Sequence, residues 1–121
     1  MVHFLKPAFL CGLFLFVPIR LLAADIVVGM SALFSGPSAS LGIEAYRGSM
    51  AYLEHINSRG GVNGRKVVIK AYDNGYDPAR AIQNTIDLIE KHQALVLFAY
   101  QGTPTVTRVL PLLKSYSERS I

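Results

Sequence analysis

The chain has 121 residues, of which 51% are hydrophobic and 17% are charged, with a formal net charge of +4 at pH 7 and one cysteine. This balance is that of a globular protein preceded by a more apolar segment. The positive charge does not predict a nucleic-acid partner. Arg65, Lys66 and Lys70 lie beside an expected turn and along an expected strand, and no aromatic platform is interleaved with them.

Residues 1–24 predict a secretory signal peptide. A positively charged start with Lys6 is followed by an apolar stretch over residues 7–19 and by the small residues Ala23 and Ala24. A membrane anchor or a buried core helix is the other interpretation, but the apolar run is shorter than the roughly 20 residues that cross a bilayer. We expect cleavage after Ala24, with a cut after Ala23 as the alternative, and a periplasmic or otherwise exported location.

The leader also holds the cysteine. Cys11 follows the bulky Leu10, which does not resemble a lipoprotein signal, so we expect Cys11 to be removed with the leader. The mature part, residues 25–121, would then have neither a disulfide nor thiol chemistry. Lys6 and Arg20 would be removed as well, so part of the positive charge belongs to targeting.

The mature part begins with an expected strand over residues 25–30, a β-branched apolar run without alternation, as in a strand buried on both faces of a parallel sheet. Residues 31–42, rich in Ser and Gly, predict a loop. A helix follows, in which Gly48 suggests close packing against a strand. Its buried face recurs at steps of three and four residues: Ile43, Tyr46, Met50, Leu53 and Ile56.

Two glycine signals separate this helix from the next strand. Gly60-Gly61 is expected to end the helix with a left-handed cap, and Asn63-Gly64 predicts a tight turn. The second strand is expected over residues 66–72.

The second expected helix begins at Asp77-Pro78, where the Asp side chain caps free amides and Pro occupies the first turn. We expect a buried stripe on this helix made of Ile82, Ile86 and Ile89.

A third buried strand is expected over residues 94–100, followed by a helix that repeats the cap-and-proline pattern at Thr103-Pro104. Pro111 predicts a kink or break in that helix. Its inward face is expected to hold Val106, Val109, Leu110 and Leu113. Alternating strands and helices with short connections predict an α/β fold with a doubly wound parallel sheet, here incomplete.

In such sheets, ligands bind beyond the carboxyl ends of the strands. Three segments reach that edge, residues 31–38 with Leu41, residues 73–76 and residues 100–103. Free amides near Thr103 can hold a carboxylate, although Thr103 as a helix cap alone is an equal interpretation. For Phe34 and Tyr100, the alternative to ligand binding is packing inside the lobe. For Tyr76, the alternative is a position on the surface. The candidate ligand-binding residues are Phe34, Ser35, Leu41, Tyr76, Tyr100, Gln101, Gly102 and Thr103.

Neither a metal site nor catalysis is expected, and we predict no enzyme and no cofactor. His3, His55 and His92 are far apart and lack zinc-ligand spacing. Asp73 and Asp77 lack the remaining carboxylates of a calcium loop. The sequence has no Gly-x-Ser-x-Gly elbow and no phosphate-cradling glycine loop.

Four blocks resemble, in order, the leucine/isoleucine/valine-binding protein family of type I periplasmic solute-binding proteins. They are FSGPSASLG at residues 34–42, INSRGGVNGRK at 56–66, YDNGYDP at 72–78 and GTPT at 102–105. The resemblance covers nearly all of the mature part. It implies a Rossmann-like lobe of a two-lobed, hinge-closing receptor that delivers a small molecule, an amino acid or similar, to the membrane permease of an ABC importer.

By position, the resemblance implies that Leu41 touches the ligand side chain and that Gly102 and Thr103 belong to the carboxylate-binding loop. Gly102 stands where family members often have a hydroxyl residue, so contact there is expected through the backbone. Asn74 stands where Asp is commoner. Residues 25–121 are expected to be only part of the amino-terminal lobe. The alternatives are a ligand-sensing domain of a signalling protein, a flavodoxin-like enzyme and a non-functional gene fragment.

Overall fold

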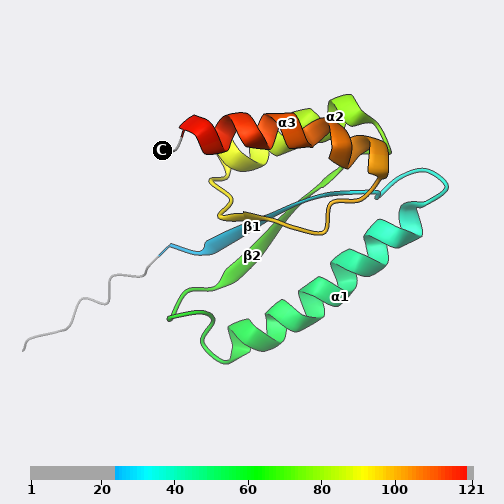
Figure 1. The fold of residues 1–121 in the computed structure, drawn as a ribbon. Helices are drawn as coiled ribbons and strands as arrows, with labels where there is room; N and C mark the ends of the chain where they lie inside the picture. Colours follow the sequence, from blue (N-terminus) through cyan, green and yellow to red (C-terminus); the bar gives the residue numbers. More distant parts are fainter. Residues whose placement is uncertain (1–23, 120–121) are drawn as a thin grey trace, which may run out of the picture.

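The computed structural model describes residues 24–119, so the predicted leader, Ala24 excepted, lies outside the described residues. Its centre is a parallel sheet in the order β2-β1-β3, formed by Ile26–Ala32 (β1), Val67–Asp73 (β2) and Val96–Leu97 (β3). One face is covered by α1 and the other by α2 and α3 (Figure 1). The predicted α/β fold with a parallel sheet is confirmed.

The helices alternate with the strands along the chain. Their bounds are Ala39–Ser58 (α1), Pro78–Ile86 (α2), which continues into the π-helical turn Asp87–Lys91 (η1), and Thr103–Arg119 (α3). No helix within residues 24–119 is long and apolar enough to cross a membrane.

The central strand β1 is buried in its carboxyl half, where Met30 and Ala32 have no exposed surface. β1 continues to Ala32, and α1 already begins at Ala39, so the loop predicted over residues 31–42 is shorter than expected.

The expected third strand is wrong in extent and burial. β3 contains only Val96 and Leu97, and the side chains of Leu95 and Val96 are 70% and 49% exposed. The backbone leaves the extended conformation at Ala99, whose φ is +52°, and no described strand pairs with the outer edge of β3. β3 is therefore an edge strand in this structure.

The predicted face of α1 is confirmed as half-buried, but the packing expected at Gly48 is not found. An added Cβ at Gly48 would meet no atom within 4 Å. The close approach occurs earlier in the helix, at the buried Gly42, where a Cβ would collide with the Leu33 backbone. Periodicity alone does not tell which of two helical glycines faces a backbone.

Both glycine signals after α1 are confirmed. Gly60 and Gly61 have φ of +98° and +72°, and Asn63-Gly64 forms a turn with positive φ at both central residues, closed by Val62 and Arg65. The Asn57 side chain bonds to the amide and carbonyl of Val67 at 2.9 and 2.8 Å, which fixes the end of α1 to the start of β2.

The cap predicted for α2 is confirmed, because Asp77 Oδ1 accepts a hydrogen bond of 2.8 Å from the Ala79 amide and Pro78 opens the helix. The predicted stripe of Ile82, Ile86 and Ile89 is half-buried, so these side chains contribute to the packing but do not form its centre. The fully buried side chains are Ala81, Thr85 and Leu88, on a neighbouring stripe of the same helix. The Thr85 hydroxyl fits there because it bonds to the Ala81 carbonyl and to Tyr100.

Of the kink or break expected at Pro111, the break is not found, because the third helix runs through this residue. Val109 is buried as predicted, and Val106 and Leu113 are half-buried. Leu110 is 56% exposed, which corrects its inward assignment. Pro111 is exposed too, so its ring and its missing donor disturb the solvent-facing side of the helix.

The two glycines of α1 give a matched pair of substitutions. Gly42→Ala is expected to lower the free energy of unfolding by more than about 1 kcal/mol, because its methyl group meets the Leu33 backbone. Gly48→Ala should raise it by roughly 0.5–1 kcal/mol, since alanine favours the helix and meets nothing. Urea unfolding followed by circular dichroism measures both. Equal effects at the two positions would contradict this packing.

Candidate functional site

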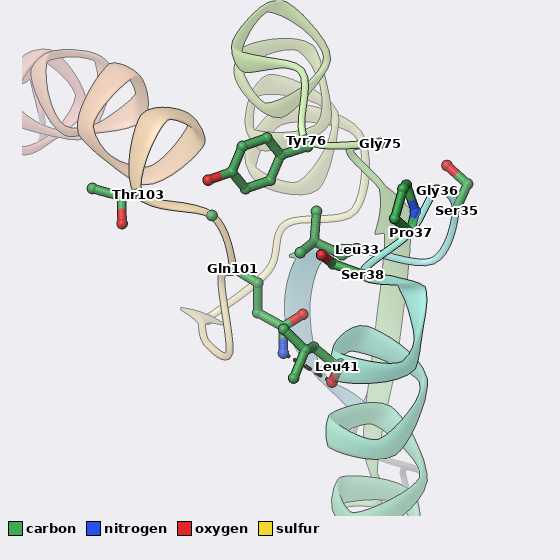
Figure 2. A pocket seen from close by; sticks show the side chains of 11 residues that line it. Leu33, Ser35, Gly36, Pro37, Ser38, Leu41, Gly75, Tyr76, Gln101 and Thr103 are labelled. Carbon is green, nitrogen blue, oxygen red and sulfur yellow. Dashed lines mark hydrogen bonds between the residues drawn. The ribbon is translucent and has the colours of Figure 1, made fainter.

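Three loops converge at the carboxyl edge of the sheet and enclose a cavity of about 610 Å³. One loop joins β1 to α1, the second joins β2 to α2 and the third joins β3 to α3, as Figure 2 shows. The lining residues are Leu33, Ser35, Gly36, Pro37, Ser38, Leu41, Gly75, Tyr76, Gln101, Gly102 and Thr103.

Six of the eight candidate residues line this cavity: Ser35, Leu41, Tyr76, Gln101, Gly102 and Thr103. Phe34 and Tyr100 lie elsewhere. The Phe34 ring packs edge-on against Tyr46, and the Tyr100 hydroxyl lies 3.0 Å from Thr85 Oγ1 beside a separate apolar cavity of about 180 Å³. Both follow the alternative of packing inside the lobe, and burial raises the pKa of Tyr100.

Sequence reasoning did not select Leu33, Gly36, Pro37, Ser38 and Gly75 individually, although each belongs to a segment expected at this edge. Apolar and glycine residues carry no chemical signal of their own. Their contribution is shape, which depends on how the loops pack together.

The first two loops are joined by the carboxylate of Asp73, the last residue of β2. It accepts hydrogen bonds from the Phe34 amide at 2.9 Å, the Gly75 amide at 3.0 Å and the Ser35 hydroxyl at 2.6 Å. Partial burial is the largest single influence and raises the pKa, but these hydrogen bonds outweigh it, so the pKa of Asp73 lies below its usual value. Asp73 is therefore a charged structural link between the loops.

Tyr76 projects toward the third loop from an unusual backbone conformation. Gly75 and Tyr76 have φ of +54° and +63°, in a turn closed by a 2.8 Å hydrogen bond from the Asp77 amide to the Asn74 carbonyl. A left-handed backbone costs a side-chain-bearing residue roughly 1–2 kcal/mol. The left-handed conformation directs the Tyr76 ring over the cavity, and 54% of the residue is exposed.

Gly102 provides the surface against which the Tyr76 ring lies. Its φ is +97°, and an added Cβ would lie 2.7 Å from Thr105 Oγ1 and 3.2 Å from two ring carbons of Tyr76. A side chain at position 102 would therefore be strained and would push the ring away. Close packing against Thr105 and Tyr76 therefore explains why glycine, and no hydroxyl residue, stands at this position.

Two helix amino termini reach the cavity. Ser38 occupies the cap position of α1 without making a side-chain cap hydrogen bond, and Thr103 is the first residue of α3. The Thr103 hydroxyl makes no hydrogen bond to another described residue. The amide ends of helices attract negative charge, and no lining residue is itself charged. The site can therefore hold an anionic group without a cationic side chain.

Gln101 crosses from the third loop to the first turn of α1. Its Nε2 donates a hydrogen bond of 3.0 Å to the Leu41 carbonyl, drawn dashed in Figure 2. Its Oε1 is buried and accepts no hydrogen bond from another described residue. The amide is thus oriented by one contact that joins two walls of the cavity.

Apolar side chains, hydroxyl groups and backbone amides make up this lining, which suits reversible binding. No group of three or more metal-ligating side chains occurs in the described part of the chain.

Comparison with known proteins places this geometry in a family context. A sequence model described as a periplasmic binding protein matches residues 25–116. An amino acid binding protein of Pseudomonas aeruginosa is 30% identical over 98 residues, which are 81% of this chain and 25% of that protein. The Leu/Ile/Val-binding protein of Escherichia coli K12 is 38% identical over 61 residues, 50% of this chain and 17% of that protein. The chain spans about a quarter or less of the length of these relatives.

Solved structures agree with the sequence matches. A possible leucine/isoleucine/valine-binding protein from Rhodopirellula baltica is 29% identical, with a TM-score of 0.74 over 82% of this chain and 27% of its own. A fatty acid ABC transporter substrate-binding protein from Thermomonospora curvata is 30% identical, with a TM-score of 0.68 over 76% of this chain and 23% of its own.

The strain at Tyr76 can be separated from the loss of its ring. Tyr76→Gly and Tyr76→Ala both remove the ring, but only glycine adopts the left-handed backbone freely, so the Gly variant should be more stable by about 1 kcal/mol. At Tyr52, 65% exposed within α1, the order should reverse, because glycine disfavours a helix by a similar amount. Thermal unfolding of the four variants tests this. A Tyr76 pair that follows the order of the Tyr52 pair would contradict the strain.

Proposed function

The chain belongs to the type I periplasmic binding protein family and corresponds to the amino-terminal part of its relatives, and we propose that it binds a small aliphatic carboxylate, such as a branched-chain amino acid. The observation that carries this proposal is the meeting of two helix amino termini with apolar side chains around one uncharged cavity. The amide ends suit the carboxylate, and Leu33, Leu41 and Tyr76 suit the aliphatic part.

The named relatives agree with this ligand class. One is an amino acid binding protein and another is a fatty acid substrate-binding protein. Amino acids and fatty acids share a carboxylate attached to an aliphatic chain, which are the two chemistries that the cavity combines. At Gly102 the carboxylate would meet backbone amide groups alone, since glycine offers no hydroxyl.

We further propose an extracytoplasmic role as the solute-binding component of an ABC importer, with a membrane permease as the partner. The relatives support this role, since one of them is an ABC transporter substrate-binding protein. Export would depend on the leader over residues 1–24, whose sequence pattern supports it.

Export predicts a defined amino terminus. When the chain is produced in a Gram-negative host, we expect the periplasmic product to start at Asp25, by intact mass. Ala24→Arg should prevent the cut after residue 24 and leave either the precursor or a product cut elsewhere, because small residues are required at the cleavage site. Arg20→Lys, which keeps the charge of the leader, is the control. A full-length product in the periplasm would contradict the leader.

Ligand binding can be followed by amide NMR of the ¹⁵N-labelled protein titrated with leucine. We expect weak, roughly millimolar affinity, because a few loop contacts have to offset the cost of association. Shifts should concentrate at Ser38–Leu41 and Gly102–Thr103 and be absent with leucinamide, which lacks the carboxylate.

A size-matched pair at Leu41, which differs in charge alone, gives the control. Leu41 is 62% exposed, so its substitution leaves the core intact. Leu41→Asp should weaken leucine binding by about tenfold relative to Leu41→Asn, because only the former places a negative charge beside the anion. Equal binding by the two variants, or equal binding of leucine and leucinamide, would exclude carboxylate recognition at this edge.

A further inference from the structure

Beneath the cavity, Asn74 joins its walls through every hydrogen-bonding group that it has. Asn74 is completely buried. Its backbone amide donates to the Ala32 carbonyl at 2.9 Å, and its carbonyl accepts from the Asp77 amide at 2.8 Å. Its side-chain Oδ1 accepts from the Tyr76 amide at 2.9 Å, and Nδ2 donates to the Gln101 carbonyl at 3.2 Å.

The two side-chain contacts reach opposite walls. The bond to Tyr76 supports the residue whose backbone is left-handed, and the bond to Gln101 holds the residue before Gly102, on which the Tyr76 ring lies. The side-chain amide of Asn74 therefore links the tyrosine wall directly to the third loop. Asp73, by contrast, joins the first two loops, and its carboxylate makes no hydrogen bond to the third loop in the described part of the chain.

The contact with Gln101 requires a donor at this position. A carboxylate can replace Oδ1 as the acceptor from Tyr76, but an ionised carboxylate cannot donate to the Gln101 carbonyl and would repel it. The Gln101 carbonyl also accepts a hydrogen bond of 2.6 Å from the Thr105 hydroxyl, so a carboxylate at position 74 removes the link between the two loops and adds repulsion, while this oxygen keeps one donor. The difference between Asn and Asp at position 74 thus falls on one contact, between the second and third loops.

We propose that Asn74 is a positioning residue that sets the spacing between Tyr76 and residues 101–103, and through it the affinity of the cavity for its solute. The part of this inference that concerns affinity rests on the proposed function. The part that concerns spacing does not, because it is visible in the protein without any ligand.

The test is Asn74→Asp in the full chain, studied by amide NMR between pH 7.5 and pH 5. Burial and the neighbouring Asp73 carboxylate should raise the pKa of the new carboxyl group. At pH 7.5 we expect the amide signals of Tyr76, Gln101 and Gly102 to move away from their wild-type positions and the affinity for leucine to fall about fivefold or more. On acidification the protonated carboxyl group can donate again, so the amide signals and the affinity for leucine should both return toward their wild-type values.

Other titratable groups near position 74 are Asp73, Asp77, Tyr76 and Arg80, and the wild type measured over the same pH range accounts for them. Asn84→Asp is the matched control, because the Asn84 side chain also donates two hydrogen bonds, to Ser31 Oγ and the Asp73 carbonyl, yet makes none to Tyr76 or Gln101. It should leave the Tyr76 and Gln101 signals close to wild type.

Asn74→Ala provides a second variant that introduces no buried charge, in case the Asp variant does not fold at neutral pH. It should show the same displaced signals and weaker binding at every pH, without recovery in acid. Wild-type signals at Tyr76 and Gln101–Thr103 in Asn74→Ala would overturn the inference, as would an Asp variant whose signals ignore pH. If wild-type protein fails to bind leucine, the proposed ligand is wrong, whereas the spacing role is still decided by the amide signals.

Discussion

The parallel register between β1 and β2 is the constraint on which the rest of the structure depends. It pairs Ile26 with Val67 and continues in step until Ala32 stands beside Asp73, so both strands end at the same level. The Asp73 carboxylate can therefore accept from the Phe34 amide, and the backbone amide of Asn74 can donate to the Ala32 carbonyl. A shift of one residue would turn every side chain of β2 to the opposite face of the sheet and break both links.

Much of the fold could be predicted because local rules and tertiary packing agree. The cap at Asp77, the left-handed Gly60-Gly61 and the turn at Asn63-Gly64 are all determined by a few neighbouring residues, and all are found. The exposure of Val96 and the choice between Gly42 and Gly48 depend on which other segment lies alongside. Such contacts join residues far apart in sequence, so periodicity does not contain them.

The residues of the candidate site also divide into those that could be predicted from the sequence and those that depend on tertiary packing. Parallel strands bring their carboxyl ends to one edge, which is why loop residues such as Ser35, Tyr76 and Gln101 could be expected to meet. Phe34 and Tyr100 stand next to lining residues, but their side chains point into the packed interior. The linking roles of Asp73 and Asn74 were not predicted, because each depends on partners 27 to 39 residues away.

The uncapped start of α1 has a consequence for how the site responds to occupancy. A helix whose cap residue leaves the first-turn amides without a side-chain acceptor is less stable by about 1 kcal/mol, so its first turn frays more readily. The amides of Ala39 and Leu41 donate instead to the backbone carbonyls of Gly36 and Ser38 at 3.1 Å, and the proposed carboxylate would be a further acceptor at this turn. Under the proposed function, part of the intrinsic binding free energy would be used to order the turn around Ser38–Leu41, and solute binding would be thermodynamically linked to local folding.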